Sequence, residues 1–444
     1  MLCLGYQVLA IPNRYSLDYG EAPLVDQAMR LASGQNIYYV DISKPPYTIS
    51  NYPPLYVTVL AGSVKLFGPS QTFQAGRLIS ALSTWITSIC LAYLIYTLTR
   101  DRFAAAGAAA TFIAFPFVLY WSPLLRIDLL ALALSLSALC MLVSEPFSAR
   151  RLVVTAVLLV AAIYTRQSYA LAAPLAAFVW LLTRDWRQAL CLTALVGGLS
   201  LALFFILNGL THGGFYFNIV TANVNEFTLD QLRFNWERFR EAALLPLVIG
   251  IFSLFLVPRW NPMWTLAAPY LVGSALSAIT IGKVGSNVNY LLELCAALSL
   301  AAGVAIAWSR IYISFYSLRA ALLIIMSFGV LRMINTTLKD YTWDLRERRA
   351  AANDLSELEA LIADTPGSIL ADEYMGMLTL QGRLLVIQPF EVTQLAWAGK
   401  WDQTPLLNSI KDKEFSATTS TSLYDRVMAS NISGVQRSFN HGRS

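Results

Sequence analysis

The sequence predicts an all-α polytopic membrane protein with about 10–11 transmembrane helices, interfacial helices in the first outer loop, and a small α/β domain at the C-terminus. Composition is the first observation: 56% of the 444 residues are hydrophobic and 13% are charged, with a mean hydropathy of +0.54. Soluble domains carry about 25% charged residues. The second observation is a series of long apolar stretches, and the third is a change of composition near residue 340.

The apolar stretches predict the membrane-spanning helices, because a helix needs roughly 20 apolar residues to cross the hydrocarbon core. They lie at 78–99, 103–125, 129–144, 152–165, 167–183, 188–209, 242–258, 260–282, 294–309 and 311–331. Their hydrophobicity is continuous rather than alternating, which excludes a transmembrane barrel. The apolar segment 1–11 resembles the end of another helix but is too short to span a bilayer.

Arginine residues predict which loops face the cytoplasm, since cytoplasmic loops are enriched in Lys and Arg. One set of short loops contains Arg100, Arg102, Arg150, Arg151, Arg184, Arg187, Arg259, Arg310 and Arg319. These loops alternate with the remaining loops, so we place the remaining loops on the outer face. The unusual polar residues of the chain therefore gather on the outer face, in the first loop at 13–77 and in the later outer loops.

The first outer loop contains an apolar segment at 52–68 that Lys65 interrupts. We interpret it as an interfacial helix that starts after the Pro-Pro pair at 53–54. Together with the apolar stretches, this loop belongs to a transmembrane domain that is expected over residues 1–338.

Residues 339–444 are expected to form a small soluble domain outside the cytoplasm. We expect this domain to begin with a charged amphipathic helix over 343–367. Strands are expected over 368–372 and 384–388, and further helices over the helix-like stretches 404–411 and 421–429.

Three basic residues in the outer loops are expected to converge at the mouth of a cavity: Arg126, Arg166 and Lys283. The stretch at 152–165 forms only ~21 Å of helix, less than the ~30 Å hydrocarbon core. A cavity at its end would let Arg166 face water rather than lipid. Simpler interpretations remain open, because Arg166 can snorkel and Asp128 can pair locally with Arg126 at a helix start.

Several function classes are disfavoured by composition. A net charge of +5 is too small to indicate a nucleic-acid partner, and two histidines leave little material for a His-based site. The sequence has neither a Walker loop nor a GxGxxG fingerprint, so we expect no nucleotide cofactor. An enzyme with its site on the outer face would receive its activated substrate through the membrane.

An ordered set of segments carries a family resemblance. "LDYGEAPLVDQAMRLASGQNIYYVD" and "YPPLYVTVLAGSVKLFGPSQTFQAGRLIS" resemble the opening of C-type (GT-C) membrane glycosyltransferases, closest to bacterial members of the protein O-mannosyltransferase and aminoarabinose transferase group. "RIDLLALALSL", "YTRQSYAL" and "GKVGSNVNYLLE" are similar to later features of that group. The resemblance covers residues 13–310 and the C-terminal domain only loosely. It implies a polyprenyl-phosphate sugar donor, an outer-face active site and inverting transfer to an acceptor hydroxyl.

The resemblance also implies roles for the acids. Asp18 matches the first-loop acid of the family, and desolvation at the membrane edge would make its carboxylate a better general base. Glu21 would orient Asp18 or the acceptor if the segment is helical. Asp128 matches a second acid that, with Asp18, would hold a divalent cation such as Mg²⁺ or Mn²⁺. The alternative is that Asp18 and Glu21 lie in a solvated loop.

Positive charge is needed for the departing lipid phosphate, and Arg126, Arg166 and Lys283 are expected to supply it. The residues expected to bind substrate are Tyr52, Asn287, Asn289, Tyr290 and Glu293. The cluster from Asn287 to Tyr290 can also serve only to cap the following helix.

The expected function is sugar transfer from a polyprenyl-phosphate donor to a lipid, polysaccharide or protein acceptor, in the bacterial cytoplasmic (inner) membrane. The alternative is a polytopic transporter or lipid flippase with an outward-facing polar cavity. No inverted repeat is visible in the sequence, which disfavours a transporter. A third possibility is a receptor whose outer domain binds a partner.

Overall fold

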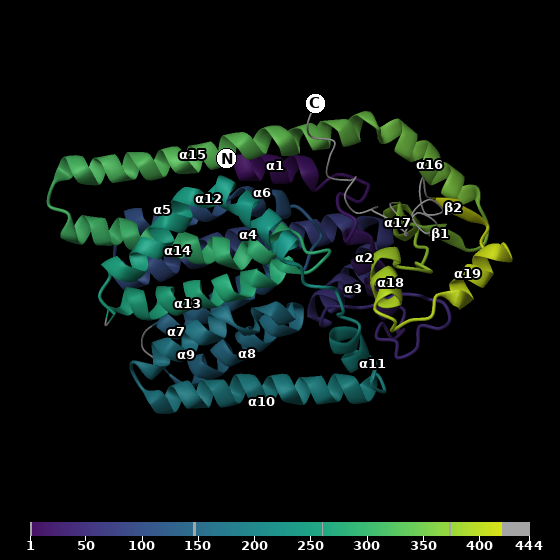
Figure 1. Cartoon of the computed structure of the whole chain (residues 1–444), viewed down its shortest axis with the longest axis horizontal. Helices are drawn as coiled ribbons and strands as arrows, with labels where there is room; N and C mark the ends of the chain where they lie inside the picture. The colour runs from purple at the N-terminus through teal and green to yellow at the C-terminus, as the bar shows by residue number, and fades with distance from the viewer. Residues whose placement is uncertain (1, 145–147, 260, 373, 420–444) are drawn as a thin grey trace.

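The helices of the transmembrane part run side by side along the long axis of the molecule (Figure 1). The structure is a computed structural model that describes residues 2–144, 148–259, 261–372 and 374–419. The bundle contains α4 (Pro69–Thr99), α5 (Arg102–Ala114), α6 (Pro116–Trp121), α7 (Asp128–Val143), α8 (Ala149–Thr165), α9 (Ala172–Leu182), α10 (Trp186–Leu210), α12 (Leu229–Leu256), α13 (Pro262–Ala278), α14 (Leu292–Tyr312) and α15 (Tyr316–Ala350).

Four helical segments in the described ranges are long and apolar enough to cross a membrane: 69–99, 186–210, 262–282 and 288–312. Shorter apolar helices pack beside them, including α5 and α7. The chain is therefore a multi-pass integral membrane protein.

Several predicted spans differ from the observed helices, among them 103–125, 242–258 and 311–331, the last of which falls mostly within α15. The stretch 103–125 is divided at Pro116 into α5 and α6, because proline lacks an N–H and clashes with the preceding turn. The stretch 242–258 is the second half of α12, which begins at Leu229 and is kinked at Ala243 (φ −130°, ψ 21°).

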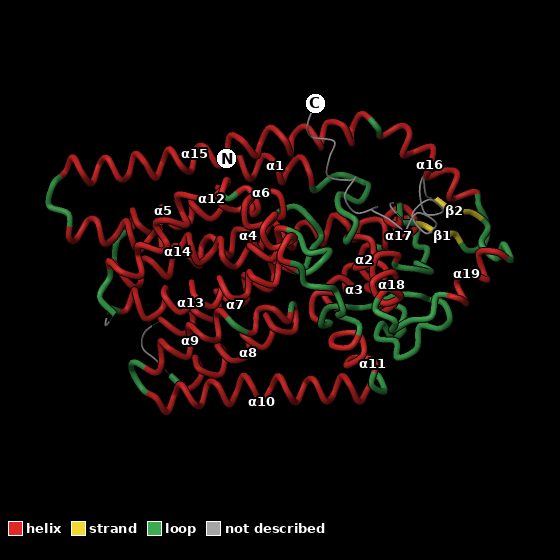
Figure 2. Tube along the Cα trace, viewed as in Figure 1, coloured by secondary structure: helices red, strands yellow, loops and turns green. Residues whose placement is uncertain are grey.

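The two ends of the bundle differ in character. The turn between α9 and α10, which contains Arg184, and the end of α14, which contains Arg310, lie at one end (Figure 1). The opposite end holds most of the loop structure (Figure 2). The segregation agrees with the sequence-based expectation that the polar loops gather away from the arginine-rich turns.

The polar end is built from short elements of the first outer loop and of later loops. These are α1 (Leu2–Ala10), α2 (Glu21–Ala32), α3 (Leu55–Phe67), η1 (Gln167–Ala170), α11 (Gly214–Tyr216), η2 (Phe217–Thr221), η3 (Ile279–Gly282) and η4 (Val288–Leu291). The predicted helix at 52–68 is present as α3 and begins directly after Pro54. It buries Tyr56, Val57 and Leu60 against the start of α4.

The C-terminal segment is mostly helical, so the structure does not show the predicted α/β domain. It comprises α16 (Ala352–Asp364), β1 (Ile369–Ala371), α17 (Met375–Leu380), α18 (Pro389–Trp397), α19 (Thr404–Lys411) and β2 (Ala417–Thr419). Its strands form one parallel pair of three residues each, and within the described ranges they are the whole sheet. The stretch predicted as a helix at 421–429 lies outside the described residues.

The predicted strand at 384–388 pairs with the first outer loop instead of with its own domain. Tyr47 donates its N–H to Val386 O (2.7 Å) and accepts from Gln388 N (3.0 Å). Leu385 N donates to Asp26 (2.8 Å), and Arg30 donates to Leu385 O (2.6 Å). Asp26 and Arg30 are themselves a buried ion pair on one face of α2. These bonds join the first outer loop and the C-terminal segment into one packed unit.

Candidate functional site

Glu21 lies at the centre of a buried hydrogen-bond network. Its carboxylate accepts from Arg77 Nε (3.1 Å) and Nη2 (2.7 Å), and both side chains are 0% exposed. It also accepts from the backbone N–H groups of Leu17 and Leu125, each at 2.8 Å. Glu21 therefore ties together the start of α2, the first turns of α4 and the loop before α7.

Asp18 lies just before α2, outside the helix, so the helical face that we expected it to share with Glu21 does not form. Its Oδ1 accepts from Gly20 N (2.9 Å) and from Arg126 Nη1 (3.1 Å). A side chain at Gly20 would collide with Arg126, because an added Cβ would stand 1.4 Å from Nη1. The glycine of the "DYGE" segment thus allows Arg126 to reach Asp18. Among the described residues, Oδ2 of Asp18 has no hydrogen-bond donor, and the side chain is 16% exposed.

Asp128 begins α7 and is buried beside Arg166. Trp121 Nε1 donates to its Oδ2 (2.7 Å), while Arg166 and Asn289 Nδ2 (3.2 Å) donate to its Oδ1. The Arg166 guanidinium also stacks over the Tyr290 ring at 4.4 Å. Arg126 lies over Trp121 at 5.2 Å, so this indole connects the two Asp–Arg pairs.

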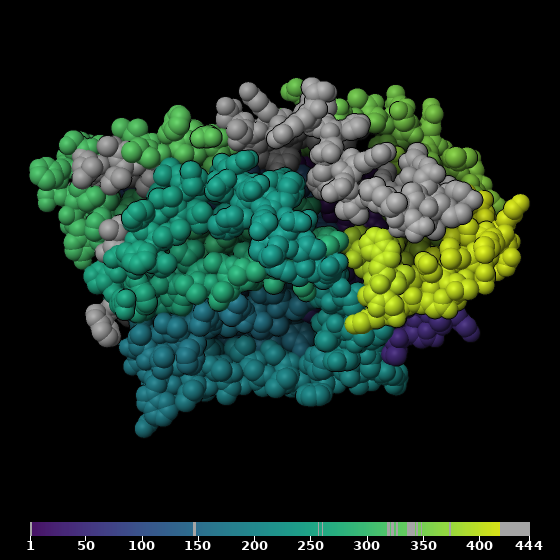
Figure 3. Space-filling model, in the orientation of Figure 1, coloured from purple at the N-terminus to yellow at the C-terminus, as the bar shows by residue number. Residues whose placement is uncertain are grey.

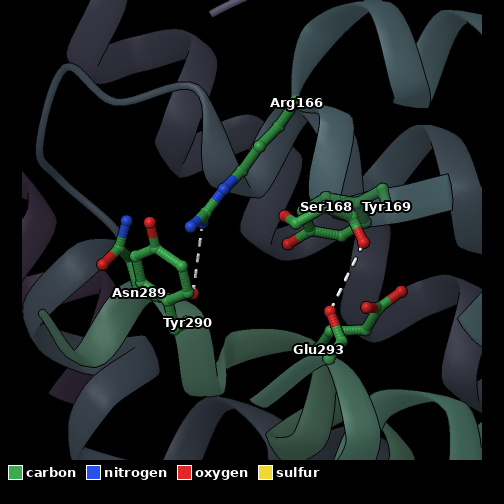
Figure 4. A pocket seen from close by; sticks show the side chains of 7 residues that line it. Arg166, Ser168, Tyr169, Asn289, Tyr290 and Glu293 are labelled. Carbon is green, nitrogen blue, oxygen red and sulfur yellow. Dashed lines mark hydrogen bonds between the residues drawn. The ribbon is translucent and has the colours of Figure 1, made fainter. Parts of the chain in front are cut away.

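A polar pocket lies beside Arg166 inside the bundle (Figure 4). It is lined by Arg166, Ser168, Tyr169, Ser277, Asn289, Tyr290 and Glu293, and its cavity volume is about 10 Å³, room for roughly one water molecule. Three buried polar atoms in its wall have no hydrogen-bond partner among the described residues: Tyr169 Oη, Asn289 Oδ1 and Glu293 Oε1. Buried polar atoms without partners are costly, so this pocket suits an ordered water or a polar group of a ligand.

Three other expected site residues, Tyr52, Lys283 and Asn287, lie in the loops around these pairs. Tyr52 is partly buried, and its desolvation raises the pKa of the phenol to about 12, with Arg126 and Arg166 opposing the shift. Lys283 donates weakly to Asn223 (3.5 Å), so its ammonium remains available at the surface. Asn287 caps η4 by accepting from Val288 N (2.7 Å), as the simpler interpretation expected.

The structure therefore brings together Asp18 with Arg126 and Asp128 with Arg166. Arg166 is buried against protein rather than facing water, contrary to our expectation. Tyr52 lies within electrostatic range of both pairs.

The two aspartates do not fit a divalent cation. Both oxygens of Asp128 already accept hydrogen bonds, and each aspartate faces a guanidinium that would repel a metal ion. Within the described ranges, no group of three His, Cys, Asp or Glu residues is arranged to hold a metal.

Three residues of the candidate site were not singled out from the sequence. Arg77 lies within the quoted segment at 52–80 and was given no role, and Trp121 stands seven residues before Asp128 in the chain. Glu391 lies in the first turn of α18, and its carboxyl is within electrostatic reach of Arg126. No spacing in the sequence indicates Glu391, because only tertiary packing brings α18 to this site.

Comparison with known proteins identifies the fold. No family model matches the chain, and no curated protein matches it by sequence. The structure of ArnT from Cupriavidus metallidurans bound to undecaprenyl phosphate is similar over 89% of this chain and 86% of that one, with a TM-score of 0.62 and 15% identity. The apo state of the same protein matches with a TM-score of 0.59.

A second similar structure is the Archaeoglobus fulgidus oligosaccharyltransferase in complex with Zn and sulfate. The match covers 88% of this chain and 62% of that chain, with a TM-score of 0.52 and 12% identity. The chain thus has the fold of the GT-C membrane glycosyltransferases.

Proposed function

We propose that this protein transfers a sugar from a polyprenyl-phosphate donor to an acceptor hydroxyl, on the outer face of a bacterial cytoplasmic membrane and with inversion at the anomeric carbon. The observation that carries the proposal is the Asp18–Arg126 pair, with one free carboxylate oxygen, at the loop-rich end of a GT-C fold. A general base and a phosphate-binding cation are the two groups that this reaction requires.

Asp18 is the proposed base. The acceptor oxygen attacks the anomeric carbon while its proton passes to Oδ2 of Asp18, the oxygen that no described residue occupies. Glu21 stays fully hydrogen-bonded to Arg77 and to the backbone, so we assign it to positioning Asp18 rather than to proton transfer.

The bond from the sugar to the phosphate oxygen breaks as the acceptor bond forms, and polyprenyl phosphate leaves as the anion. Arg126 is the proposed group that neutralises it, because a guanidinium binds phosphate oxygens in a bidentate manner. Arg166 and Lys283 are the further cations of the proposed donor site. Asp128 holds Arg166 in place through a buried ion pair.

The donor class is inferred from the fold and from chemistry. The similar ArnT structure contains undecaprenyl phosphate, and this chain places Arg126 beside Asp18 at its loop-rich end. Tyr52, Asn289, Tyr290 and Glu293 are the proposed contacts of the sugar, with Asn287 at the rim. The unpartnered oxygens of Asn289 and Glu293 are able to accept hydrogen bonds from sugar hydroxyls.

The test is transfer of label in membranes supplied with a panel of radiolabelled undecaprenyl-phosphate-linked hexoses and pentoses. Asp18→Asn removes the proton acceptor while keeping the hydrogen-bond geometry, and we expect the rate to fall by about 10²–10⁴-fold. Asp41→Asn makes the same change at an exposed position of the same loop and should leave the rate unchanged.

Binding of undecaprenyl phosphate separates loss of chemistry from loss of structure. The Asp18→Asn variant is expected to bind undecaprenyl phosphate as tightly as the wild type does. Transfer that persists unchanged in Asp18→Asn would overturn the proposal. Uptake or flipping of donor lipid that is insensitive to Asp18→Asn would favour a transporter instead.

A further inference from the structure

The C-terminal segment brings a carboxyl group to the proposed active site. Figure 3 shows this segment packed over the first outer loop at one end of the molecule. The pairing of Tyr47 with Ile387 and the bonds of Asp26 and Arg30 to Leu385 fix the chain just before α18. Ile49 N also donates to the Gln388 side chain (3.0 Å), directly ahead of the first turn of α18.

The first turn of α18 is held between two loops of the site. Phe390 N donates to the hydroxyl of Tyr19 (3.3 Å), the residue that follows Asp18. The Phe390 ring lies over Gly285, where an added Cβ would stand 2.1 Å from the ring. Gly285 has φ +80°, so both its conformation and its contact with Phe390 favour glycine. Phe390 thus touches both the "DYGE" segment and the turn that follows Lys283.

Glu391 is the next residue, and its carboxyl points into the interior of this arrangement. Asn51 donates a hydrogen bond to this carboxyl, and the positive charge of Arg126 stabilises its ionised form. Its Oε2 is buried and has no hydrogen-bond partner among the residues that the structure describes. Burial raises the pKa of Glu391 to about 7, against the lowering by Arg126 and with a smaller rise from Asp372.

The charges around Glu391 suit a neutral acceptor. The groups that face it are Arg126, which is already paired with Asp18, the carboxyl of Asp372, and the phenol of Tyr19. Because Arg126 is assigned to the phosphate of the donor, a second phosphate on the acceptor would be repelled by this excess of carboxylates, whereas hydroxyl groups would donate to them. The donor lipid enters from the membrane, and α18 belongs to the part of the molecule beyond the bundle (Figure 1).

We propose that Glu391 is a specificity-determining residue of the acceptor site, which accepts a hydrogen bond from an uncharged, hydroxyl-rich acceptor and disfavours acceptors with a phosphate beside the hydroxyl. This inference rests on the proposed glycosyltransferase function and names its acceptor class.

The test varies the acceptor while the donor is held saturating. Membranes from cells that lack the protein supply the acceptor, and labelled undecaprenyl-phosphate sugar supplies the donor. Glu391→Gln is expected to raise the amount of acceptor membrane needed for half-maximal rate by about tenfold, the worth of one charge-assisted hydrogen bond. Competition by undecaprenyl phosphate should change less than twofold. Glu357→Gln, at an exposed position of α16, is the matched control.

The pH profile gives a second readout that a purely structural role would not move. In the wild type, the rate at low acceptor is expected to rise through about pH 7, as Glu391 ionises and becomes the better hydrogen-bond acceptor. Glu391→Gln should abolish this rise, and Glu391→Asp should retain it in part. Because burial disfavours the charged carboxylate, Glu391→Gln, which places a neutral amide there, is expected to melt at a higher temperature than the wild type when the pH is above 7.

The outcomes separate the two proposals. If Asp18→Asn abolishes transfer but Glu391→Gln keeps the wild-type acceptor dependence and pH profile, the inference about Glu391 is overturned and the proposed function stands. Weaker undecaprenyl phosphate binding in Glu391→Gln would place the residue on the donor side and would equally overturn it. Faster transfer to phosphate-bearing acceptors than to neutral ones by the wild type would also contradict it. Unaltered transfer in Asp18→Asn would instead refute the proposed function itself.

Discussion

Arg77→Met is expected to destabilise the protein strongly, because it leaves Glu21 as an unpaired buried charge. Both side chains are 0% exposed, and the pair has two hydrogen bonds of 3.1 and 2.7 Å. Arg77 also donates to the carbonyl oxygens of Asn13 and Tyr15, which would lose their partner. The substitution therefore removes every bond that Arg77 makes between α4 and the segment that carries Asp18.

The magnitude follows from the burial of the pair. Removing one partner of a buried ion pair costs about 3–5 kcal/mol. An unfolding entropy of roughly 2.1 cal/mol/K per residue over the whole chain converts this cost to a drop of about 3–5 °C in melting temperature. Asp18 and Arg126 lie on the loops that Glu21 holds. The rate of sugar transfer by Arg77→Met should therefore fall even at temperatures below its melting transition.

The assay is thermal unfolding of the full chain in detergent. The fraction of protein that stays monodisperse is measured at each temperature. Arg233→Met is the matched control, since Arg233 is 74% exposed and 3.9 Å from Asp230. The double variant Arg77→Met/Glu21→Gln should recover part of the loss, because it removes the unpaired charge. If Arg77→Met melts within 1 °C of Arg233→Met, a margin of roughly 1 kcal/mol, the network around Glu21 does not hold the site as described.

Two further predictions concern orientation and the docking of the C-terminal segment. With the exposed Cys191 changed to serine, Ser43→Cys should react with a membrane-impermeant maleimide added outside the cell and Arg187→Cys should not; the reverse labelling would place the site in the cytoplasm. Arg14→Gln should cost about 0.2–1 kcal/mol, because in its 2.6 Å pair with Glu359 the Arg14 side chain is 60% exposed and the Glu359 side chain 16% exposed. The hydrogen bond from Arg14 lowers the pKa of Glu359 in the folded protein. The contribution of this pair to the free energy of unfolding is therefore present above the pKa of Glu359 in the unfolded chain, and it is lost as the pH falls through the lower pKa of the folded state. The melting difference between Arg14→Gln and the wild type should therefore shrink below about pH 4; a difference that grows at low pH would contradict this assignment.

Much of the helical framework was predictable, because hydrophobic stretches of a given length have few alternatives in lipid. Segments 78–99 and 188–209 became the long helices α4 and α10, and the Pro-Pro pair at 53–54 marked the start of α3. The break at Pro116 also follows from local chemistry. The C-terminal segment was harder, since 384–388 has the pattern of a strand but pairs with Tyr47, far away in the chain.

The residues of the candidate site were partly predictable from their type. Charged groups such as Asp18, Arg126, Asp128 and Arg166 stand out in a chain with so few charges. Their pairing was not predictable, because Asp128 has Arg126 two residues away yet binds Arg166 across the bundle. We expected a metal at Asp128, whereas the tertiary structure surrounds that carboxylate with Trp121, Arg166 and Asn289.

The sequence by itself determined that this is a multi-helix membrane protein with its polar chemistry gathered at one end, since the free energy of placing apolar and charged groups in lipid depends on local composition. Only the tertiary structure decided which charges neutralise one another and that α18 brings Glu391 to the site. Those outcomes depend on contacts between residues hundreds of positions apart, such as Asp26 with Leu385, and no local pattern encodes them.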